Sequence, residues 1–419
     1  MDLIPKPGQV VSAAGNVAHL VLGGGVADLR PMPRTLVEEG PLREVHHYRP
    51  AAGVRQQGDP VLLVTPLAAP ARCYDLRRGC SLVEHLVAAG RPTYLVEYGE
   101  VDVRDRELGM EPWVDEVVPR AIEAVSAHAG GRPVHLVGWS LGGILALLTA
   151  ADRTDLPIAS VSVVGSPTDV SQVPLVAPPR PLLDPTEGRD LVARGFQVAG
   201  AVPGVRWAVR LPSFQRLVAK PLAVAAHLDD SEFLAQVEAV DRFTAAMAAY
   251  SGRAFGQLYH RFVTGNALVG GSMELSGRTI TLSSITAPVL VLAGTTDGIA
   301  PVAAVKAVVQ HLAGARDVRF EIVPGGHLGM LTGRAARTAT WPVLDEWFEE
   351  WTSSEPVAKA AAKKKQAKKA AARKKAPDAT PRKAAGKRAP AARTAPSPKA
   401  IGANPKRRYG SGGSRSLSP

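Results

Sequence analysis

Residues 134–146 read VHLVGWSLGGILA, an apolar run that leads into Gly-Trp-Ser-Leu-Gly and then into a helix-forming segment. A serine between two such glycines, directly after a buried strand, is typical of a nucleophile in a sharp strand-to-helix turn. Glycine is required there because neighbouring side chains would clash in so tight a turn. The stretch therefore predicts that Ser140 is a nucleophile at the carboxyl end of a strand. The alternative is a glycine-rich turn with an idle serine.

Two loops further along the chain carry the partners that a serine nucleophile needs. A serine hydroxyl becomes reactive when a histidine accepts its proton, and a carboxylate fixes the tautomer of that histidine. Asp297 follows the run PVLVLAG and His327 follows the run VRFEIVP, in the chain order serine, acid, histidine. We therefore predict that Ser140, Asp297 and His327 are catalytic and meet at one edge of a sheet. Asp169, which follows the strand after the serine turn, is the alternative acid.

Short runs rich in valine and leucine alternate with helix-like segments, which indicates a mostly parallel sheet with helices on both faces. The predicted strands are 61–65, 93–98, 134–138, 159–165, 289–294 and 318–323, with 42–48 as an added edge strand. The predicted helices are 81–89 with Ser81 as its cap, 112–129 with a kink at Pro119, 141–151, 302–313 and 340–351. Trp347 and Trp351 share one face of the last helix and are predicted to pack in the core. With the serine turn, this pattern predicts the α/β class and an α/β-hydrolase fold.

The alternation of strands and helices stops between about residues 167 and 285, where prolines cluster and longer helix-like stretches follow. A segment inserted between two late strands lies over the carboxyl ends of the strands and can roof the site. The segment therefore predicts an inserted, largely helical cap. The predicted organisation is an N-terminal segment (1–40), the first part of the core (41–167), the cap (168–284), the second part of the core (285–355) and a basic tail rich in Lys, Ala and Pro (356–419).

Backbone amides must be in place to stabilise the oxyanion of a tetrahedral intermediate. The amide that follows the nucleophile is one donor, which assigns Leu141 to this role. The second donor comes from the loop after an earlier strand, here Thr65-Pro66-Leu67-Ala68. Pro66 has no N–H, so the second donor is predicted at Leu67 or Ala68.

No pattern in the sequence indicates a metal or a bound cofactor. The acidic residues between Glu97 and Glu107 are interleaved with Arg104 and Arg106, which is typical of a solvated loop, and no H-E-x-x-H motif occurs. The glycine run 23–25 lacks the Lys and the Ser or Thr of a phosphate loop. Five histidines without a partner pattern are predicted to be structural: His46, His47, His85, His135 and His311.

The formal charge of +12 is unevenly distributed along the 419 residues. Residues 356–419 hold 19 Lys and Arg against the single acid Asp378, a net +18, whereas the remaining chain holds 31 basic and 37 acidic residues, a net −6. A segment this basic and this poor in aromatics cannot bury a core, so the tail is predicted to be disordered. Its charge favours nucleic acid as a partner through counterion release. An anionic membrane or granule surface is the other candidate partner, and a merely solubilising extension is the alternative.

The N-terminal region lacks the features of a secretion signal, because it has no basic start and its apolar stretch is interrupted by Gly15, Asn16 and His19. No apolar run reaches the roughly 18 residues that a membrane-spanning helix needs. Cys73 and Cys80 match the spacing of neither a zinc site nor a redox pair, so reduced thiols are predicted. The expected location is the cytoplasm, with association to the nucleoid or to granules through the tail.

Between about residues 60 and 351 the chain resembles the polyhydroxyalkanoate synthase-like α/β-hydrolases. The resemblance rests on PVLLVTPLAAPARCYDLRRGCSLVEHLVAAGRPTYLVEYG (60–99), HLVGWSLGG (135–143), FVTGNALVGGSMELSGRTITLSSITAPVLVLAGTTDGIAP (262–301) and GGHLGM (325–330). Members of this family join hydroxyacyl groups from coenzyme A thioesters into polyester with a cysteine, an aspartate and a histidine. The resemblance implies Ser140, Asp297 and His327 at the matching positions. Serine thus replaces the cysteine, and Gly298 stands where a histidine often follows the aspartate.

These residues leave three functions open. The leading prediction is a serine acyl hydrolase or acyltransferase that acts on a small hydroxyacyl ester or thioester, because a serine nucleophile forms an ester that water can resolve. A coenzyme A thioester is a candidate substrate, and no cofactor is expected. The first alternative is polyester synthesis with Ser140 in place of the cysteine. The second is a DNA- or granule-tethering scaffold with an inactive hydrolase fold, against which the intact Ser140, Asp297 and His327 argue.

Overall fold

The computed structural model describes residues 12–16, 24–99, 105, 107–173, 223–248 and 252–353. The predicted basic tail (356–419) and the proline-rich part of the predicted cap lie outside these ranges. Within them, no helix combines the length and the apolar character needed to cross a membrane.

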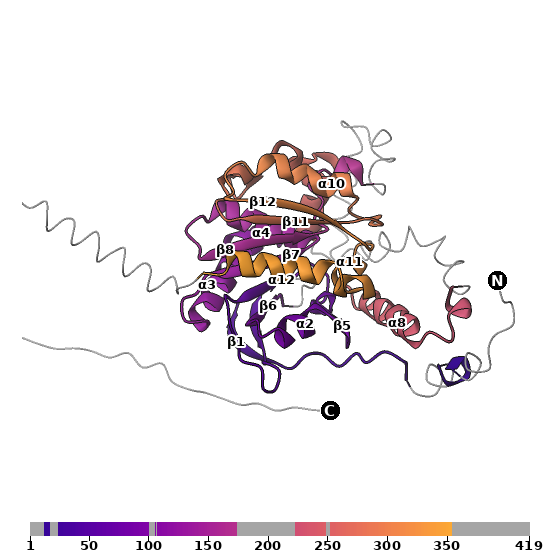
Figure 1. The fold of residues 1–419 in the computed structure, drawn as a ribbon. Helices are drawn as coiled ribbons and strands as arrows, with labels where there is room; N and C mark the ends of the chain where they lie inside the picture. The colour runs from indigo at the N-terminus through magenta and orange to yellow at the C-terminus, as the bar shows by residue number, and fades with distance from the viewer. Residues whose placement is uncertain are drawn as a thin grey trace, which may run out of the picture. The chain divides into compact units, whose positions relative to one another are not determined.

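An eight-stranded sheet forms the centre of this structure, in the order β1-β2-β6-β3-β7-β8-β11-β12 (Figure 1). Its strands are β1 (Arg34–Gly40), β2 (Arg43–Tyr48), β3 (Val61–Val64), β6 (Thr93–Glu97), β7 (Val134–Trp139), β8 (Ile158–Val164), β11 (Val289–Gly294) and β12 (Val318–Val323). The pairs from β6 to β12 are parallel, and β2 pairs antiparallel with both β1 and β6. All seven predicted strands are present, with ends within one residue of the predicted ones. The prediction of a mostly parallel sheet is therefore confirmed.

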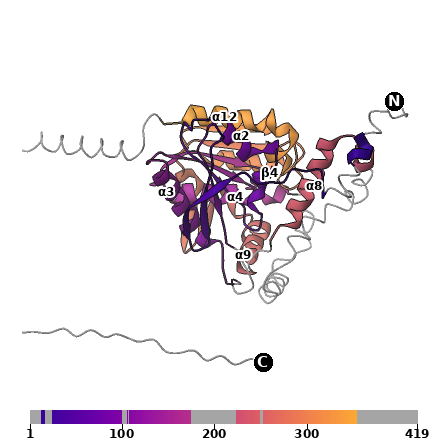
Figure 2. The same cartoon turned by 90° about the horizontal axis from the view of Figure 1, so that it is seen from below.

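Helices cover both faces of the sheet (Figures 1 and 2). The α-helices are α2 (Leu82–Ala88), α3 (Val118–His128), α4 (Leu141–Asp152), α8 (Ser231–Ala245), α9 (Gly252–Gln257), α10 (Val302–Lys306), α11 (Gly329–Thr332) and α12 (Thr340–Trp351). The shorter elements are η1 (Ala71–Cys73), β4 (Asp75–Arg77), β5 (Cys80–Ser81), η3 (Trp113–Val117), η4 (Val170–Gln172), η7 (Leu258–Thr264), η8 (Ala267–Gly270), β9 (Ser272–Leu275), β10 (Arg278–Thr281), η9 (Leu282–Ser284), η10 (Ala307–His311) and η11 (Arg334–Arg337).

Two local helix predictions have clear structural outcomes. The Ser81 hydroxyl accepts a hydrogen bond from the N–H of Glu84 (3.0 Å), so Ser81 caps α2 as predicted. The predicted helix 112–129 begins as the π-helical segment η3 and becomes α-helical at Val118. Pro119 lies at this change and has no N–H to donate to the preceding turn, which accounts for the irregularity.

Alternate residues of the central strands face two separate hydrophobic layers. Leu62 and Val64 of β3 pack in the layer that contains α3 and α4, whereas Val61 and Leu63 pack in the layer that contains α2 and α12. This division follows from the two-residue period of a strand. Since both faces are covered, the strands read as continuous apolar runs, and this is why the sequence reveals them.

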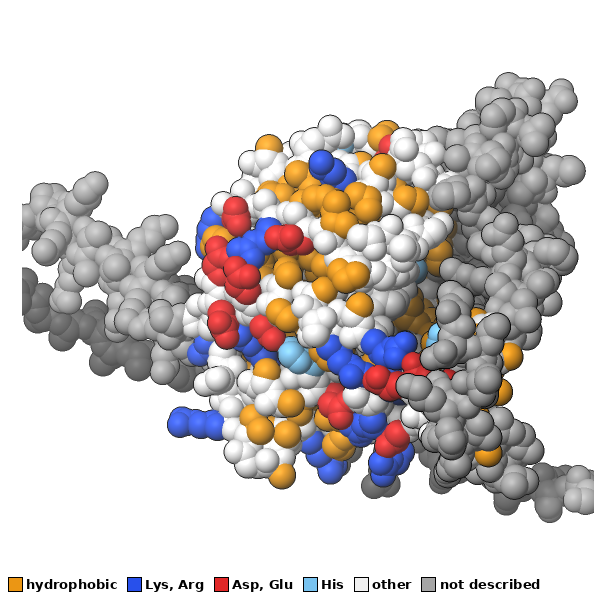
Figure 3. Space-filling view, turned by 45° about the vertical axis from the view of Figure 1, so that its right-hand side comes forward, with side chains coloured by type: hydrophobic (Ala, Val, Ile, Leu, Met, Phe, Trp, Pro, Cys, Tyr) orange, Lys and Arg blue, Asp and Glu red, His pale blue; other side chains and the backbone are white. Residues whose placement is uncertain are grey.

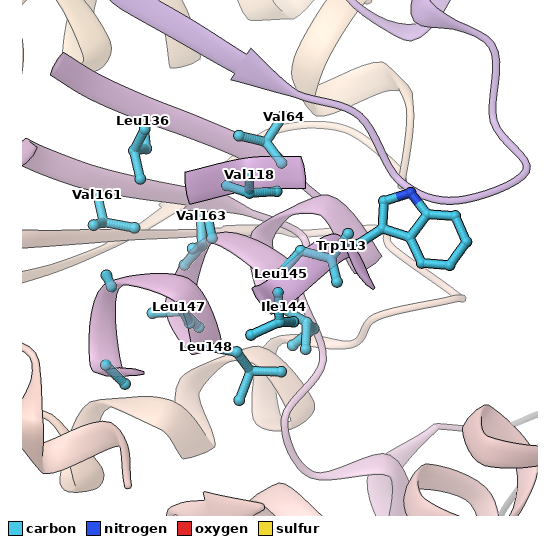
Figure 4. Close-up of a cluster of buried hydrophobic side chains, with 14 of the residues drawn as sticks. Val64, Trp113, Val118, Leu136, Ile144, Leu145, Leu147, Leu148, Val161 and Val163 are labelled. Atoms are coloured by element: carbon cyan, nitrogen blue, oxygen red, sulfur yellow. The ribbon is translucent and has the colours of Figure 1, made fainter. Parts of the chain in front are cut away.

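Helix α4 is buried along almost its whole length. Figure 4 shows Ile144, Leu145 and Leu148 of α4 among strand residues that include Val161 and Val163, and each of these five is at most 2% exposed. Each fully buried aliphatic side chain contributes about 1.5–3 kcal/mol. The helix that begins directly after Ser140 is therefore held firmly against the sheet.

The aromatic residues of α12 pack in the other layer. Trp347 is fully buried, Trp351 is partly buried, and the centroids of their rings lie 5.7 Å apart. The prediction of core packing for this pair is confirmed.

Strand β1 was not predicted, and its residues fall in the range that the sequence analysis assigned to the N-terminal segment. It pairs with β2 at the edge of the sheet, and none of its residues is fully buried. An edge strand needs no continuous apolar run, so the sequence RTLVEEG carries little strand signal.

The hairpin of β9 and β10 was also not predicted. Its turn passes through Ser276 and Gly277, whose φ values of 52° and 74° are those of a tight hairpin turn. Met273, Leu275 and Ile280 are buried in the same hydrophobic cluster as α4. This last part of the predicted cap thus packs with the helices of the core.

Candidate active site

The chain turns sharply at Ser140, between β7 and α4. Ser140 has φ 54° and ψ −124°, a conformation that costs a residue with a side chain about 1–3 kcal/mol. Its N–H donates to Val164 O (2.9 Å), and its own carbonyl accepts from the N–H of Gly143 (3.1 Å). The surrounding backbone therefore holds the strained turn from both sides, as expected for a serine that must stand at the end of its strand.

The glycines around Ser140 are required by close backbone approaches. A Cβ on Gly138 would lie 2.5 Å from the Cα of Gly143. A Cβ on Gly142 would lie 2.2 Å from Val64 O and 3.0 Å from the nitrogen of Pro66. The motif thus allows the start of α4 to lie directly against the end of β3 and the loop that follows it.

His327 lies in the loop after β12 and faces the serine. Its Nε2 is 2.9 Å from Ser140 Oγ. The indole N–H of Trp139 donates to the carbonyl of His327 (2.8 Å), and the two rings lie 4.9 Å apart. Trp139 therefore holds the backbone of the histidine. The sequence does not indicate this role, because the contact joins residues 188 positions apart and the motif accepts any residue at this position.

Asp297 lies in the loop after β11 and contacts the other nitrogen of the histidine. Its Oδ2 is 2.8 Å from His327 Nδ1, and its Oδ1 accepts hydrogen bonds from the N–H groups of Ile299 and Ala300 (both 2.8 Å). The Asp297 side chain is fully buried and the His327 side chain is 11% exposed. Because the two amides fix the carboxylate, Nδ1 carries the proton that it donates to Asp297, and Nε2 is left as an acceptor for the Ser140 hydroxyl.

The alternative acid, Asp169, is hydrogen-bonded to other residues. Its Oδ1 accepts from the Ser171 N–H (3.0 Å) and from the side-chain amide of Asn266 (2.7 Å). Burial raises the pKa of Asp169, but hydrogen bonds from Ser171, Asn266 and Gln172 together outweigh burial and bring the pKa below its usual value. The structure thus brings Asp297, and not Asp169, to His327.

Of the predicted oxyanion donors, Leu141 directly follows the serine, and Leu67 and Ala68 belong to the loop after β3. Leu141 is the first residue of α4, where an N–H has no helical carbonyl to bind. Leu67 is 4% exposed, and Ala68 has a φ of 64°. The contact of Gly142 with Val64 and Pro66 places the Thr65–Ala68 loop beside the start of α4. The assignment of Leu141 with Leu67 or Ala68 as donors stays a prediction.

Helix α8, from the predicted cap, contacts both parts of this site. The ring of Phe243 meets the ring of Trp139 edge-on at 6.1 Å, and Phe243 is 4% exposed. The N–H of Ala248 donates to Ala68 O (2.8 Å). The end of α8 therefore packs against the residue before the serine and is bonded to the Thr65–Ala68 loop.

His135 has a structural environment, as predicted. It is fully buried in β7, and its Nδ1 is 2.8 Å from Ser160 Oγ. Burial, with Arg91 and Arg132 nearby, lowers its pKa to about 3. It is therefore neutral at physiological pH.

One group of possible metal ligands occurs among the described residues, formed by Glu44, His46 and Glu97. Arg34 already binds Glu97 (2.6 Å), and His46 Nε2 lies 3.0 Å from Glu44 Oε2. These contacts link side chains of β1, β2 and β6 to one another. The absence of a metal and of a cofactor stays a prediction.

Comparison with solved structures supports the same architecture. A highly thermostable carboxyl esterase from Bacillus coagulans, in complex with glycerol, superposes with a TM-score of 0.51 at 14% identity and covers 76% of this chain and 99% of the esterase. At this identity the likeness shows the fold alone.

Similar sequences are named as polymerase subunits. The poly(3-hydroxyalkanoate) polymerase subunit PhaC of Allochromatium vinosum is 25% identical over 72% of this chain and 84% of its own length. The corresponding subunit of Thiocystis violacea is 23% identical over 81% of this chain and 94% of its own length. That of Haloarcula marismortui is 24% identical over 79% of this chain and 70% of its own length.

A family model described as the alpha/beta hydrolase fold matches residues 91–334, more than half of the chain. The match spans β7, the Ser140 turn and the loops of Asp297 and His327. The chain belongs to the α/β-hydrolase fold family, in which it resembles the poly(3-hydroxyalkanoate) polymerases.

Proposed function

We propose that this α/β-hydrolase enzyme is a serine acyl hydrolase or acyltransferase that acts on hydroxyacyl esters or thioesters through an acyl-Ser140 intermediate. The observation that carries the proposal is the chain of contacts from Ser140 Oγ to His327 Nε2 (2.9 Å) and from His327 Nδ1 to Asp297 Oδ2 (2.8 Å). These distances are within hydrogen-bond range, as a nucleophile and its general base require.

In the proposed acylation step, Ser140 Oγ bonds to the acyl carbonyl carbon while its proton passes to His327 Nε2. The buried carboxylate of Asp297 stabilises the imidazolium that forms. The amide of Leu141, with that of Leu67 or Ala68, stabilises the oxyanion. The intermediate then breaks its bond to the leaving thiolate or alkoxide, which takes the proton from His327.

In the proposed deacylation step, water or the hydroxyl of an acceptor gives its proton to His327 and attacks the acyl carbon. The bond to Ser140 Oγ breaks, and Ser140 recovers its proton from His327. The three side chains supply the nucleophile, the base and the stabilising charge, so the proposed reaction uses no metal and no cofactor.

The substrate class in this proposal comes from the similar proteins, whose name specifies 3-hydroxyalkanoate polymers. A hydroxyacyl thioester of coenzyme A is the monomer that the family resemblance implies. Polymerisation by Ser140 is the second candidate, favoured by the coverage of those polymerase subunits over most of this chain. A serine nucleophile favours the hydrolase over the polymerase, because the acyl ester that it forms can be resolved by water.

We expect purified protein incubated with 3-hydroxybutyryl-coenzyme A to release free coenzyme A and free 3-hydroxybutyrate in equal amounts. Thiol release and chromatography of the acid measure the two products. Insoluble polyester in place of free acid would favour the polymerase. If p-nitrophenyl esters are cleaved but neither product forms from the thioester, the acyl-serine chemistry stands and the thioester substrate is wrong. The Ser140→Ala variant controls for spontaneous hydrolysis.

We also infer that the basic tail tethers the enzyme to nucleic acid. The body of the chain has a net charge of −6, and on the face shown in Figure 3 its acidic and basic side chains are interspersed. Arg334 and Arg337, for example, are paired with acidic residues of α8 or its cap. The net +18 of residues 356–419 is thus the main cationic feature of the chain.

Duplex DNA should bind the full chain with an affinity that falls about 10³-fold or more between 50 and 200 mM salt, since counterion release scales with the number of neutralised phosphates. Fluorescence anisotropy of labelled DNA measures this slope. A chain that lacks residues 356–419 is the matched control and should not bind. In the opposite outcome, the full chain fails to bind DNA even at 50 mM salt and binds vesicles of anionic lipid. That result would contradict the nucleic-acid role and favour a membrane or granule surface as the partner of the tail.

A further inference from the structure

A buried tyrosine hydroxyl lies between the two strands that lead into the candidate active site. Tyr74 follows η1, and its side chain is fully buried. Its hydroxyl donates to Val64 O (2.7 Å), at the end of β3, with Val137 O (3.1 Å) as a second acceptor. The same oxygen accepts a hydrogen bond from the N–H of Trp139 (2.9 Å), at the end of β7.

The hydroxyl occupies the point where β3 and β7 part. The ladder between the two strands ends at the pair Val64 and Gly138. Trp139 lies one residue beyond that pair, so the phenol joins the two backbones where direct pairing ends. A side chain that both donates and accepts can make this bridge. Removal of the oxygen therefore removes its bonds to β3 and to β7 together.

The two joined strands each lead into a different half of the site. The residue after Val64 begins the Thr65–Ala68 loop, and the residue after Trp139 is Ser140. The bridge therefore helps to set the separation between the predicted oxyanion amides and the nucleophile, together with the packing of Gly142 against Val64 and Pro66. Stabilisation of an oxyanion requires donors about 2.7–3.1 Å from the oxygen, so a small change of this separation weakens it.

Two further hydrogen bonds of the Thr65–Ala68 loop go to residues outside β7 and the serine turn. The hydroxyl of Tyr98 donates to Thr65 O (2.8 Å), and the N–H of Ala248 donates to Ala68 O (2.8 Å). Neither of these two bonds is made to Trp139 or Ser140. Burial raises the pKa of the Tyr74 phenol well above its usual value, so the hydroxyl keeps its proton and remains a donor at any working pH.

We propose that Tyr74 is a positioning residue that fixes the oxyanion-stabilising amides of the Thr65–Ala68 loop relative to Ser140 Oγ. It acts through the backbones of Val64 and Trp139 and does not touch the substrate. This role rests on the proposed acyl-serine function. It predicts that loss of the hydroxyl weakens binding of the tetrahedral transition state more than binding of the substrate.

The test compares Tyr74→Phe with Tyr94→Phe. Tyr94 is also almost fully buried (2% exposed), and its hydroxyl bonds to His128 Nδ1 (2.8 Å), so the control removes one buried hydroxyl elsewhere. We expect Tyr74→Phe to lower kcat on a p-nitrophenyl ester about 10- to 100-fold with KM changed less than about 3-fold, which is the scale of a misplacement near 1 Å. The affinity for a boronic acid, which forms a tetrahedral adduct with serine, should fall by a similar factor. Tyr94→Phe should change each value less than about 3-fold.

Amide hydrogen exchange supplies a readout that requires no activity. In the wild-type chain the Trp139 amide should exchange slowly, and in Tyr74→Phe exchange should accelerate in residues 137–142 and 64–68 together. A wild-type Trp139 amide that exchanges as an unbonded one would overturn the bridge even if Tyr74→Phe cannot be folded. Faster exchange with unchanged kcat would overturn the catalytic role. If the wild type shows the protected amide but no serine chemistry at all, the proposed function fails while the bridge between the strands stands.

Discussion

Ser140→Ala should abolish labelling by a fluorophosphonate probe and lower kcat for ester hydrolysis by about 10⁶-fold, the loss seen when a serine nucleophile is removed from an intact site. The physical reason is that, among the described residues, Ser140 Oγ is the group bonded to His327 Nε2, and its removal leaves no nucleophile beside the base. Fluorescence of the labelled band and initial rates on a p-nitrophenyl ester measure the two losses. The variant should keep its unfolding midpoint, because Ser140 Oγ serves no bond in the core.

Ser162→Ala is a matched control for this experiment. Ser162 is a fully buried serine of β8 whose hydroxyl has no hydrogen-bond partner among the described residues. The control should label and turn over as the wild type does. A folded wild-type protein that resists the probe would contradict the acyl-serine proposal and favour the tethering scaffold.

Asp297→Asn should lower kcat by about 10³- to 10⁴-fold and leave the fold intact. The asparagine oxygen can still accept from Ile299 and Ala300, which places its amide group toward His327 Nδ1. Nδ1 must then accept, so the proton moves to Nε2 and the ring can no longer take the proton of Ser140. Rates on the same ester at neutral pH measure the effect.

The comparison that decides between the two candidate acids is Asp169→Asn. Asp169 binds Ser171 and Asn266 and is not bonded to His327, so this variant should keep activity within about 3-fold of the wild type. The two variants make the same chemical change at loops after neighbouring strands, β8 and β11. A larger loss in Asp169→Asn than in Asp297→Asn would show that the acid of the working enzyme is Asp169.

Much of the fold could be predicted because the central strands are buried on both faces. Such strands carry a nearly continuous apolar run, and Val289–Gly294 is the clearest example, with every residue buried. β1 and the β9–β10 hairpin escaped prediction for the opposite reason. Their alternating or exposed side chains resemble loop sequence until a neighbouring strand is present.

The sequence predicted the nucleophile and the histidine of the candidate site but left two candidates for the acid. The Ser140 turn has a local signature, since its glycines answer a steric requirement within a few residues. The acid has none, because Asp169 and Asp297 both follow parallel strands that end at the same edge. The choice depends on which carboxylate is bonded to His327. The side chain of Asn266, a residue in a left-handed conformation with φ 47°, is bonded to Asp169 instead.

By itself, the sequence determined where the central strands lie along the chain and that most of them are parallel. It also determined the sharp turn at Ser140 and the chain order of its partners. Each of these depends on side-chain periodicity or on residues within one turn. Only the tertiary structure decided that Asp297 is the acid bonded to His327, that Trp139 holds the histidine backbone and that Tyr74 joins the two strands. These contacts link residues 30, 188 and 65 positions apart. No local pattern specifies such pairs, since they exist only once the sheet has brought the ends of its strands to one edge.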